Sequence, residues 1–140
     1  MIDIDAQDLA QRYVAQWTEP DASVRRTAIE RLWAEDGTHV LQPPEEMRET
    51  AAALGFDHTA LEAQGHDAIE IRVARSYERF VEKEGFTFRS RGDAVRLHGV
   101  VKFGWDAVSV ATGDVLGGGI DILVLDAGGR IQTDYQFPDA

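Results

Sequence analysis

The start of the chain places apolar side chains at helical spacing. Leu9, Tyr13 and Trp17 recur at every fourth position, and Asp5 stands before them. Because residues four apart lie on the same side of a helix, the pattern predicts a helix over residues 5–18 with an aromatic stripe facing the core. Aspartate side chains often accept hydrogen bonds from the first N–H groups of a helix, so Asp5 is the expected N-cap.

A second helix is predicted to follow the break at Pro20 and Asp21, with Gly37 as its C-terminal cap. Its inner face is expected to hold the apolar residues that recur along it, Val24, Ala28, Leu32 and Trp33. Residues 38–42 form a short apolar run that ends at two prolines. This run predicts a brief strand at the edge of a sheet.

Residues 45–54 are weakly amphipathic and predict a short surface helix, followed by a loop through His58 to Gly65. Two interpretations of residues 45–64 stay open, a lid over a pocket or a segment that packs elsewhere. Asp67 is then expected to cap a long third helix that runs to Gly85. Its apolar side is predicted to hold Ile69, Val73, Tyr77 and Phe80.

Beyond residue 85 the apolar pattern changes to a period of two, which is typical of strands. The predicted strands are residues 86–91, 94–107, 114–125 and 130–137, separated by glycine-containing turns. Helices first and a sheet last predict one α+β domain over residues 1–140, with three to four helices on the concave face of a curved antiparallel sheet.

Composition narrows the choice of partners and compartment. The 140 residues carry 14 Lys and Arg against 25 Asp and Glu, a net charge of -11, so the average surface field repels phosphate backbones and anionic lipid headgroups. We therefore expect neither nucleic acid nor membrane as a partner. The start of the chain lacks the pattern of a signal peptide, and a cytoplasmic location is expected.

No cofactor and no metal are expected. The chain has no cysteine, and its histidines at 39, 58, 66 and 98 lack metal-ligand spacing. No glycine-rich nucleotide-binding loop and no Gly-x-Ser-x-Gly motif occurs. Chemistry is left to histidine, carboxylates, tyrosine or arginine.

Asp121 is a charged residue inside the otherwise apolar strand predicted at 114–125. Burial disfavours the ionised form of a carboxyl group and raises its pKa, which suits a general acid or hydrogen-bond donor. A structural aspartate paired with an arginine or a turn amide is the alternative. For Tyr13 the helical spacing favours a core role over a catalytic one, but a contact between Tyr13 and Asp121 would satisfy both groups.

Other residues are predicted to surround a ligand or to face solvent. Trp17, Phe103 and Trp105 are expected to wall an apolar pocket. The alternation of the strand at 94–107 places His98 on the solvated face with Lys102, and His98 is kept as a secondary ligand-binding candidate. Arg89 and Arg91 are expected on a solvated face, and the glycines at 117–119 favour a β-bulge.

Three short segments carry a resemblance to a known family. They are Gln11-Arg12-Tyr13-Val14-Ala15, Leu32-Trp33-Ala34-Glu35-Asp36-Gly37-Thr38, and Gly119-Ile120-Asp121 followed by Arg130-Ile131. With this element order, the chain resembles the nuclear-transport-factor-2-like (NTF2-like) superfamily, nearest to ketosteroid isomerases and SnoaL-like polyketide cyclases. The resemblance implies a cone-shaped, cystatin-like fold and a homodimer that pairs through the outer sheet face.

The resemblance also implies roles for individual residues. In ketosteroid isomerases a helix-one tyrosine and a protonated aspartic acid donate hydrogen bonds to a dienolate oxygen, and Tyr13 and Asp121 match these positions. The family's aspartate base on the first strand has no counterpart at residues 38–42, where His39 is the expected substitute. Limonene-epoxide-hydrolase relatives use an Asp-Arg-Asp set, for which no second aspartate is obvious.

Two hypotheses of different classes follow. The first is a cofactor-independent isomerase, cyclase or hydratase that acts on a small apolar carbonyl compound, with Asp121 as acid or donor, Tyr13 as oxyanion donor and His39 as base. The second is a non-catalytic small-ligand binding or dimerisation module, in which Tyr13 and Asp121 only satisfy each other.

Overall fold

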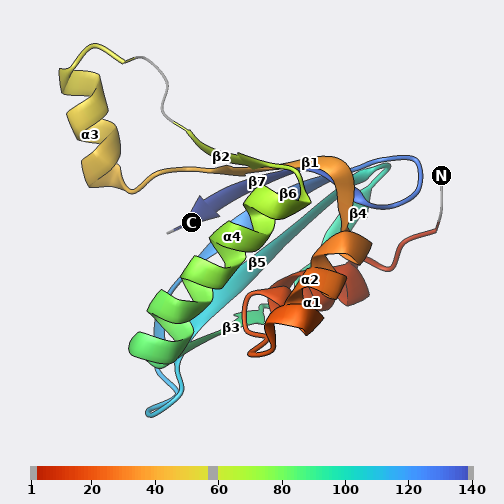
Figure 1. Ribbon diagram of the computed structural model, residues 1–140, viewed down its shortest axis with the longest axis horizontal. Coiled ribbons are helices and arrows are strands. Elements are labelled where there is room, and N and C mark those ends of the chain that lie inside the picture. The colour runs from red at the N-terminus through yellow and green to blue at the C-terminus, as the bar shows by residue number, and fades with distance from the viewer. Residues whose placement is uncertain (1–2, 57–59, 139–140) are drawn as a thin grey trace.

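The computed structural model describes residues 3–56 and 60–138, and over these ranges it packs helices against one face of a seven-stranded sheet (Figure 1). The helices are α1 (Ala6–Gln16), α2 (Ala22–Leu32), α3 (Glu45–Ala53) and α4 (His66–Ser76), which continues into the π-helical segment η1 (Tyr77–Lys83). The strands are β1 (Trp33–Leu41), β2 (Leu61–Gln64), β3 (Phe86–Ser90), β4 (Val95–Leu97), β5 (Val100–Ser109), β6 (Val115–Leu125) and β7 (Ile131–Pro138).

The sheet has the order β2-β1-β7-β6-β5-β3, and β4 pairs with β5. The predicted meander of β3, β5, β6 and β7 is confirmed as antiparallel, while β1 runs parallel to β7 and makes the sheet mixed. The core lies between the sheet and α1, α2 and α4. The predicted α+β class is therefore confirmed.

Local signals explain where the first two helices begin. The Asp5 side chain accepts the backbone N–H of Asp8 at 3.1 Å, and Asp21 accepts the N–H groups of Ser23 and Val24 at 2.8 and 3.1 Å. These bonds satisfy N–H groups that lack a partner within the helix. The predicted start of the first helix is confirmed.

The predicted inner face of the second helix is confirmed at Leu32 but wrong at Val24. Arg25, Ile29 and Leu32 are the buried residues of α2, whereas Val24 is 48% exposed. Gly37 is not a helix cap, because α2 passes directly into β1 and Gly37 lies where the register between β1 and β7 shifts. The predicted brief edge strand is instead a long strand between β2 and β7.

The predicted short surface helix after β1 is confirmed as α3, whereas the loop predicted to reach Gly65 contains the strand β2. None of the side chains of α3 is buried, and this helix stands apart from the other helices beyond the end of β1 (Figure 1). The predicted N-cap of the next helix is wrong, because Gly65 precedes α4 and the Asp67 side chain pairs with Arg26 at 2.8 Å. His58 lies outside the described residues. Among the described residues, no helix is long and apolar enough to cross a membrane.

The glycines of β6 combine a bulge with a close approach. The register with β5 shifts between Ala107 and Val108, opposite Gly117, which confirms the predicted bulge. A Cβ atom on Gly119 would lie 2.7 Å from the ring of Trp105 and 2.6 Å from the carbonyl oxygen of Phe137. The missing side chain of Gly119 therefore makes the space that Trp105 occupies.

We expect Gly119→Ala to lower the free energy of unfolding by about 1–3 kcal/mol, because overpacking displaces either the indole ring or the backbone of β7. Gly117→Ala is the matched control, since a Cβ atom there meets nothing within 4 Å. Its effect should stay within about 0.5 kcal/mol. Urea unfolding of both variants provides the measurement, and equal stability would contradict the close-approach argument.

Candidate functional site

Four ionisable side chains meet in the interior between the helices and the sheet. Tyr13 and His39 are each 1% exposed, and Asp121 and Asp134 are fully buried. They come from α1, β1, β6 and β7. Because burying polar groups is costly unless they bond to one another, these contacts define the strongest candidate site in the described chain.

Each aspartate uses one carboxyl oxygen to accept hydrogen bonds from neighbouring side chains. Asp121 Oδ1 accepts the indole N–H of Trp105 at 2.7 Å and the amide N–H of Gln136 at 3.2 Å. Asp134 Oδ2 accepts the hydroxyl of Tyr13. The remaining oxygens, Asp121 Oδ2 and Asp134 Oδ1, are buried and have no other hydrogen-bond partner.

A single proton shared between the two carboxyl groups gives both remaining oxygens a hydrogen-bond partner. Burial raises the pKa of Asp121. Burial, and next the negative charge of Asp121, raise the pKa of Asp134 well above its ordinary value. Two carboxyl groups in direct contact cannot both ionise, so the pair retains a proton where separate carboxyls would lose both. An acid and a base thus lie side by side.

Tyr13 remains protonated in this environment. Burial first, and then the charges of Asp121 and Asp134, raise the pKa of Tyr13 well above its ordinary value. Tyr13 and Asp121 lie in one cluster, but the Tyr13 hydroxyl donates to Asp134 and not to Asp121.

The contacts of His39 do not fit the predicted base. Its Nδ1 lies 2.9 Å from Arg72 Nη1, and its Nε2 lies 3.0 Å from Gln136 Oε1. Burial, and then the charge of Arg72, lower the pKa of His39 from 6.5 to about 3. The ring is neutral at pH 7, so its 3.7 Å approach to Asp134 is not an ion pair. Both ring nitrogens are already engaged.

Sequence reasoning missed Asp134, the second carboxyl of the pair. Strict alternation from Ile131 would turn Asp134 outward, yet both residues are fully buried. The register between β6 and β7 shifts next to Ile131, between Val124 and Leu125, and this irregularity breaks the alternation. Arg72 and Gln136 were also missed, because each looks like an ordinary polar surface position.

The predicted pocket residues fall into two groups. Phe103 is 1% exposed and packs edge-on against Tyr13 with ring centroids 5.4 Å apart, so it is part of the core. Trp17 and Trp105 are half-buried. Trp17 lies 5.5 Å from the His39 ring, and its buried indole N–H has no hydrogen-bond partner.

His98 does not join this cluster. It is exposed in the turn between β4 and β5 and has a left-handed backbone conformation, with φ of 51°. The turn divides the single strand that was predicted at 94–107. Arg89 and Arg91 both pair with Asp106, which agrees with the outward orientation expected for them.

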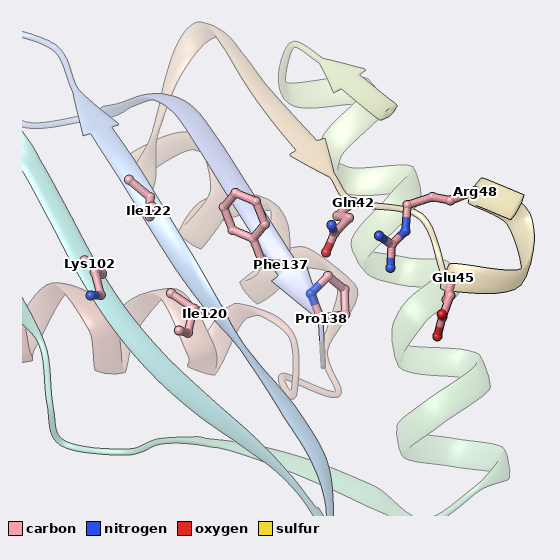
Figure 2. Close-up of a pocket in the computed structure, with 8 residues that line it drawn as sticks. All are labelled: Gln42, Glu45, Arg48, Lys102, Ile120, Ile122, Phe137 and Pro138. Atoms are coloured by element: carbon pink, nitrogen blue, oxygen red, sulfur yellow. The ribbon is translucent and has the colours of Figure 1, made fainter. Parts of the chain in front are cut away.

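Two surface hollows lie away from the cluster. One of about 470 Å³ opens on the outer sheet face beside α3, where Ile120, Ile122 and Phe137 stand near Lys102 and Arg48 (Figure 2). The other, of about 540 Å³, lies between α2 and the start of α4 and includes Trp33, His66 and Arg130. Neither is lined by an aspartate of the pair. Among the described residues, no group of three or more histidine and carboxylate side chains is placed to hold a metal ion.

Comparison with solved structures identifies the fold. A candidate isomerase of the SnoaL-like family from Agrobacterium tumefaciens C58 is 25% identical and aligns over 96% of this chain and 97% of its own, with a TM-score of 0.76. An NTF2-like protein of unknown function from Exiguobacterium sp. 255-15 is 18% identical over 96% and 98%, with a TM-score of 0.59. A candidate polyketide cyclase from Sinorhizobium meliloti is 11% identical over 92% and 93%, also at 0.59. No protein-family model and no curated protein matches the sequence.

The depressed pKa of His39 predicts a loss of stability in mild acid. The unfolded chain protonates this ring below about pH 6.5, whereas the folded protein does so only near pH 3, so stability falls as the pH drops between these values. The loss from about pH 7.5 to about pH 5 should be about 2 kcal/mol.

Urea unfolding of wild type and His39→Gln at both pH values measures this loss. The variant should lose about 2 kcal/mol less than wild type over that range, whatever its stability at the higher pH. The raised pKa values of the aspartates act in the opposite direction, but both proteins contain that pair. Equal pH dependence in the two proteins would contradict a buried neutral His39.

Proposed function

We propose, from the SnoaL-like, NTF2-like fold to which this chain belongs, that its aspartate pair makes it a cofactor-independent acid–base enzyme, an isomerase or cyclase of a small apolar carbonyl compound. The observation that carries this proposal is the contact between the buried carboxyl groups of Asp121 and Asp134, each of which has one oxygen without any other partner. Buried carboxyl pairs of this kind are costly to a fold and are typical of acid–base sites.

Asp121 is the member of the pair that we assign to the substrate. It bonds to Trp105, which is half-buried and packs against Phe88 on the edge strand β3 with ring centroids 5.7 Å apart. Asp134 bonds instead to the fully buried Tyr13. Asp121 is thus connected to the outside through one aromatic side chain, and Asp134 lies behind it.

Asp121 acts first as a base and then as an acid in the proposed reaction. The Asp121 carboxylate removes a proton from the carbon next to the substrate carbonyl, and the C–H electron pair moves towards the carbonyl oxygen. The resulting Asp121 acid then returns the proton to another carbon, which restores the carboxylate and completes an isomerisation. Asp134 keeps the shared proton and stabilises the charge of Asp121 during both transfers.

A donor for the carbonyl oxygen is also needed. The Tyr13 hydroxyl is already bonded to Asp134, but the buried indole N–H of Trp17 is unpartnered and lies beside Tyr13 and His39. We therefore assign the oxygen contact to Trp17 in place of Tyr13. Trp17→Phe removes this N–H and keeps the aromatic ring.

A binding module without catalysis is the second candidate, and burial favours it. Tyr13, Asp121 and Asp134 are at most 1% exposed, and the two hollows described above lie elsewhere. Substrate must therefore displace side chains to reach the pair. The two functions differ in whether the pair exchanges protons with a bound carbonyl compound.

A tryptophan-fluorescence titration with planar phenols and cyclic enones tests binding. Phenols that mimic a dienolate should bind the wild type saturably, and Trp17→Phe should weaken this binding by about 1 to 3 kcal/mol, because the bound oxygen then loses its N–H donor. Asp121→Asn should retain the binding, because its neutral amide resembles the protonated Asp121 that accompanies the dienolate. Trp105 is the reporter common to all three proteins, and binding that ignores Trp17→Phe would favour the binding module.

Exchange of the enone α-proton in D₂O, followed by proton NMR, tests the chemistry without knowledge of the product. Wild type should accelerate the exchange, and Asp121→Asn and Asp134→Asn should each lose about 10²-fold or more of the rate. Gly117→Ala serves as the folded control. Saturable binding with no exchange in wild type would remove the enzyme proposal and leave the binding module.

A second copy of the chain is the partner that we propose. Val100, Tyr135 and Phe137 are 37%, 43% and 37% exposed on the outer sheet face, and Phe137 lines the hollow in Figure 2. Ile120 and Ile122 add half-buried apolar area between them. Apolar faces of this kind commonly mark interfaces, and a two-fold dimer would cover the same patch on both copies.

Sedimentation velocity should therefore find a species of twice the 15.5 kDa chain mass. Tyr135→Glu should shift it to the monomer, because a charge in the centre of an apolar interface loses its hydration. Val24→Glu is the matched control, since Val24 is 48% exposed on α2, which covers the other face of the sheet. A wild type that sediments only as a monomer would refute the dimer.

A further inference from the structure

A line of side-chain hydrogen bonds leads from the edge of the fold to the aspartate pair. Arg72 of α4 is half-buried, and its Nη1 lies 2.9 Å from His39 Nδ1. His39 Nε2 lies 3.0 Å from Gln136 Oε1, and Gln136 Nε2 donates to Asp121 Oδ1 at 3.2 Å. The line therefore joins α4, β1, β7 and β6.

Each bond in this line can have only one direction. A guanidinium group has donors and no acceptor, so His39 Nδ1 must accept the bond from Arg72. The neutral ring then carries its hydrogen on Nε2 and donates to Gln136 Oε1. This contact orients the amide, whose NH₂ group is left to donate to Asp121.

The direction of the line decides how the two aspartates differ. Asp121 receives two N–H donors, from Gln136 and Trp105, whereas Asp134 receives the Tyr13 hydroxyl. More donors stabilise the ionised form, so the shared proton belongs on Asp134. The titratable and charged groups that face the pair are Tyr13 from α1, His39 from β1 and, through His39, Arg72 from α4.

We propose that Arg72 is a positioning residue which, through His39 and Gln136, keeps Asp121 as the base and Asp134 as the acid of the pair. The inference rests on the proposed function for its importance, since the placement of this proton matters to catalysis only if the pair reacts. Arg72 also donates to the backbone oxygens of His39 at 3.3 Å and Leu61 at 3.1 Å. These contacts hold the guanidinium in place.

Two NMR measurements on the free protein test the inference. Histidine ¹⁵N shifts report which ring nitrogen of His39 carries hydrogen, and aspartate carboxyl ¹³C shifts report the titration midpoints of Asp121 and Asp134. In wild type we expect hydrogen on Nε2 alone, and a lower midpoint for Asp121 than for Asp134. Hydrogen on Nδ1 in wild type would overturn the proposal.

Arg72→Met should mix the two tautomers of His39 and raise the Asp121 midpoint by about 1 pH unit, since one of its donors loses its fixed orientation. Arg72→Lys should restore much of the wild-type pattern, because its ammonium group also donates. Arg75→Met is the control, because Arg75 is the next arginine along α4 and its side chain is exposed. A folded Arg72→Met with the wild-type tautomer and midpoint would overturn the proposal.

Gln136→Leu tests the same line without touching Arg72. It should raise the Asp121 midpoint as Arg72→Met does, but leave the His39 hydrogen on Nε2. An unchanged Asp121 midpoint would overturn the proposal even if Arg72→Met fails to fold. Because these measurements need no ligand, the inference can fail while the phenol titration and enone exchange succeed, and the reverse holds as well.

Discussion

Two carboxyl groups that face each other inside a protein core cannot both carry a charge, and the interior of this protein is arranged around that constraint. The contact between Asp121 and Asp134 requires a retained proton, and the oxygens outside this contact, Asp121 Oδ1 and Asp134 Oδ2, require donors. Tyr13, Trp105 and Gln136 supply them from three different elements. The aromatic residues that pack around the pair exclude water, which strengthens the constraint further.

Irregular strand pairing places several side chains of the buried cluster. The register shift in β1 at Gly37 and the shift between β6 and β7 interrupt a strict two-residue period. The second shift lies beside Ile131 and accompanies the burial of Asp134, while Gly119 leaves room for the Trp105 ring that bonds Asp121. Bulges that redirect side chains next to functional sites are common in curved sheets.

The sequence predicted those features that depend on local pattern. Residues close together in the sequence determine the helix starts at Asp5 and Asp21 and the meander of β3, β5, β6 and β7. The same holds for the isolation of Asp121 in an apolar strand. The family resemblance added the fold in which these helices and strands are arranged. What failed depended on tertiary contacts, which sequence periodicity does not encode.

Asp134 and His98 illustrate that limit from opposite sides. Asp134 stands among polar neighbours and becomes buried only through an irregular strand pairing, while His98 stands in an apparently continuous strand that a left-handed turn interrupts. His39 was predicted as a base, and it lies in the cluster as a neutral ring whose two nitrogens are engaged. Its neutral state could not be foreseen, because its pKa is lowered first by burial in the folded core and then by the charge of Arg72, which is 33 positions away along the chain.

The separation along the chain of the bonded residues has a consequence for how the protein folds. Tyr13 and Asp134 are 121 positions apart, and His39 and Gln136 are 97 apart. No local fragment can therefore assemble the cluster, and such distant contacts form only after the cost of closing long loops has been met. Uptake of the shared proton should accordingly belong to the final stage of folding, when the last strand docks between β1 and β6.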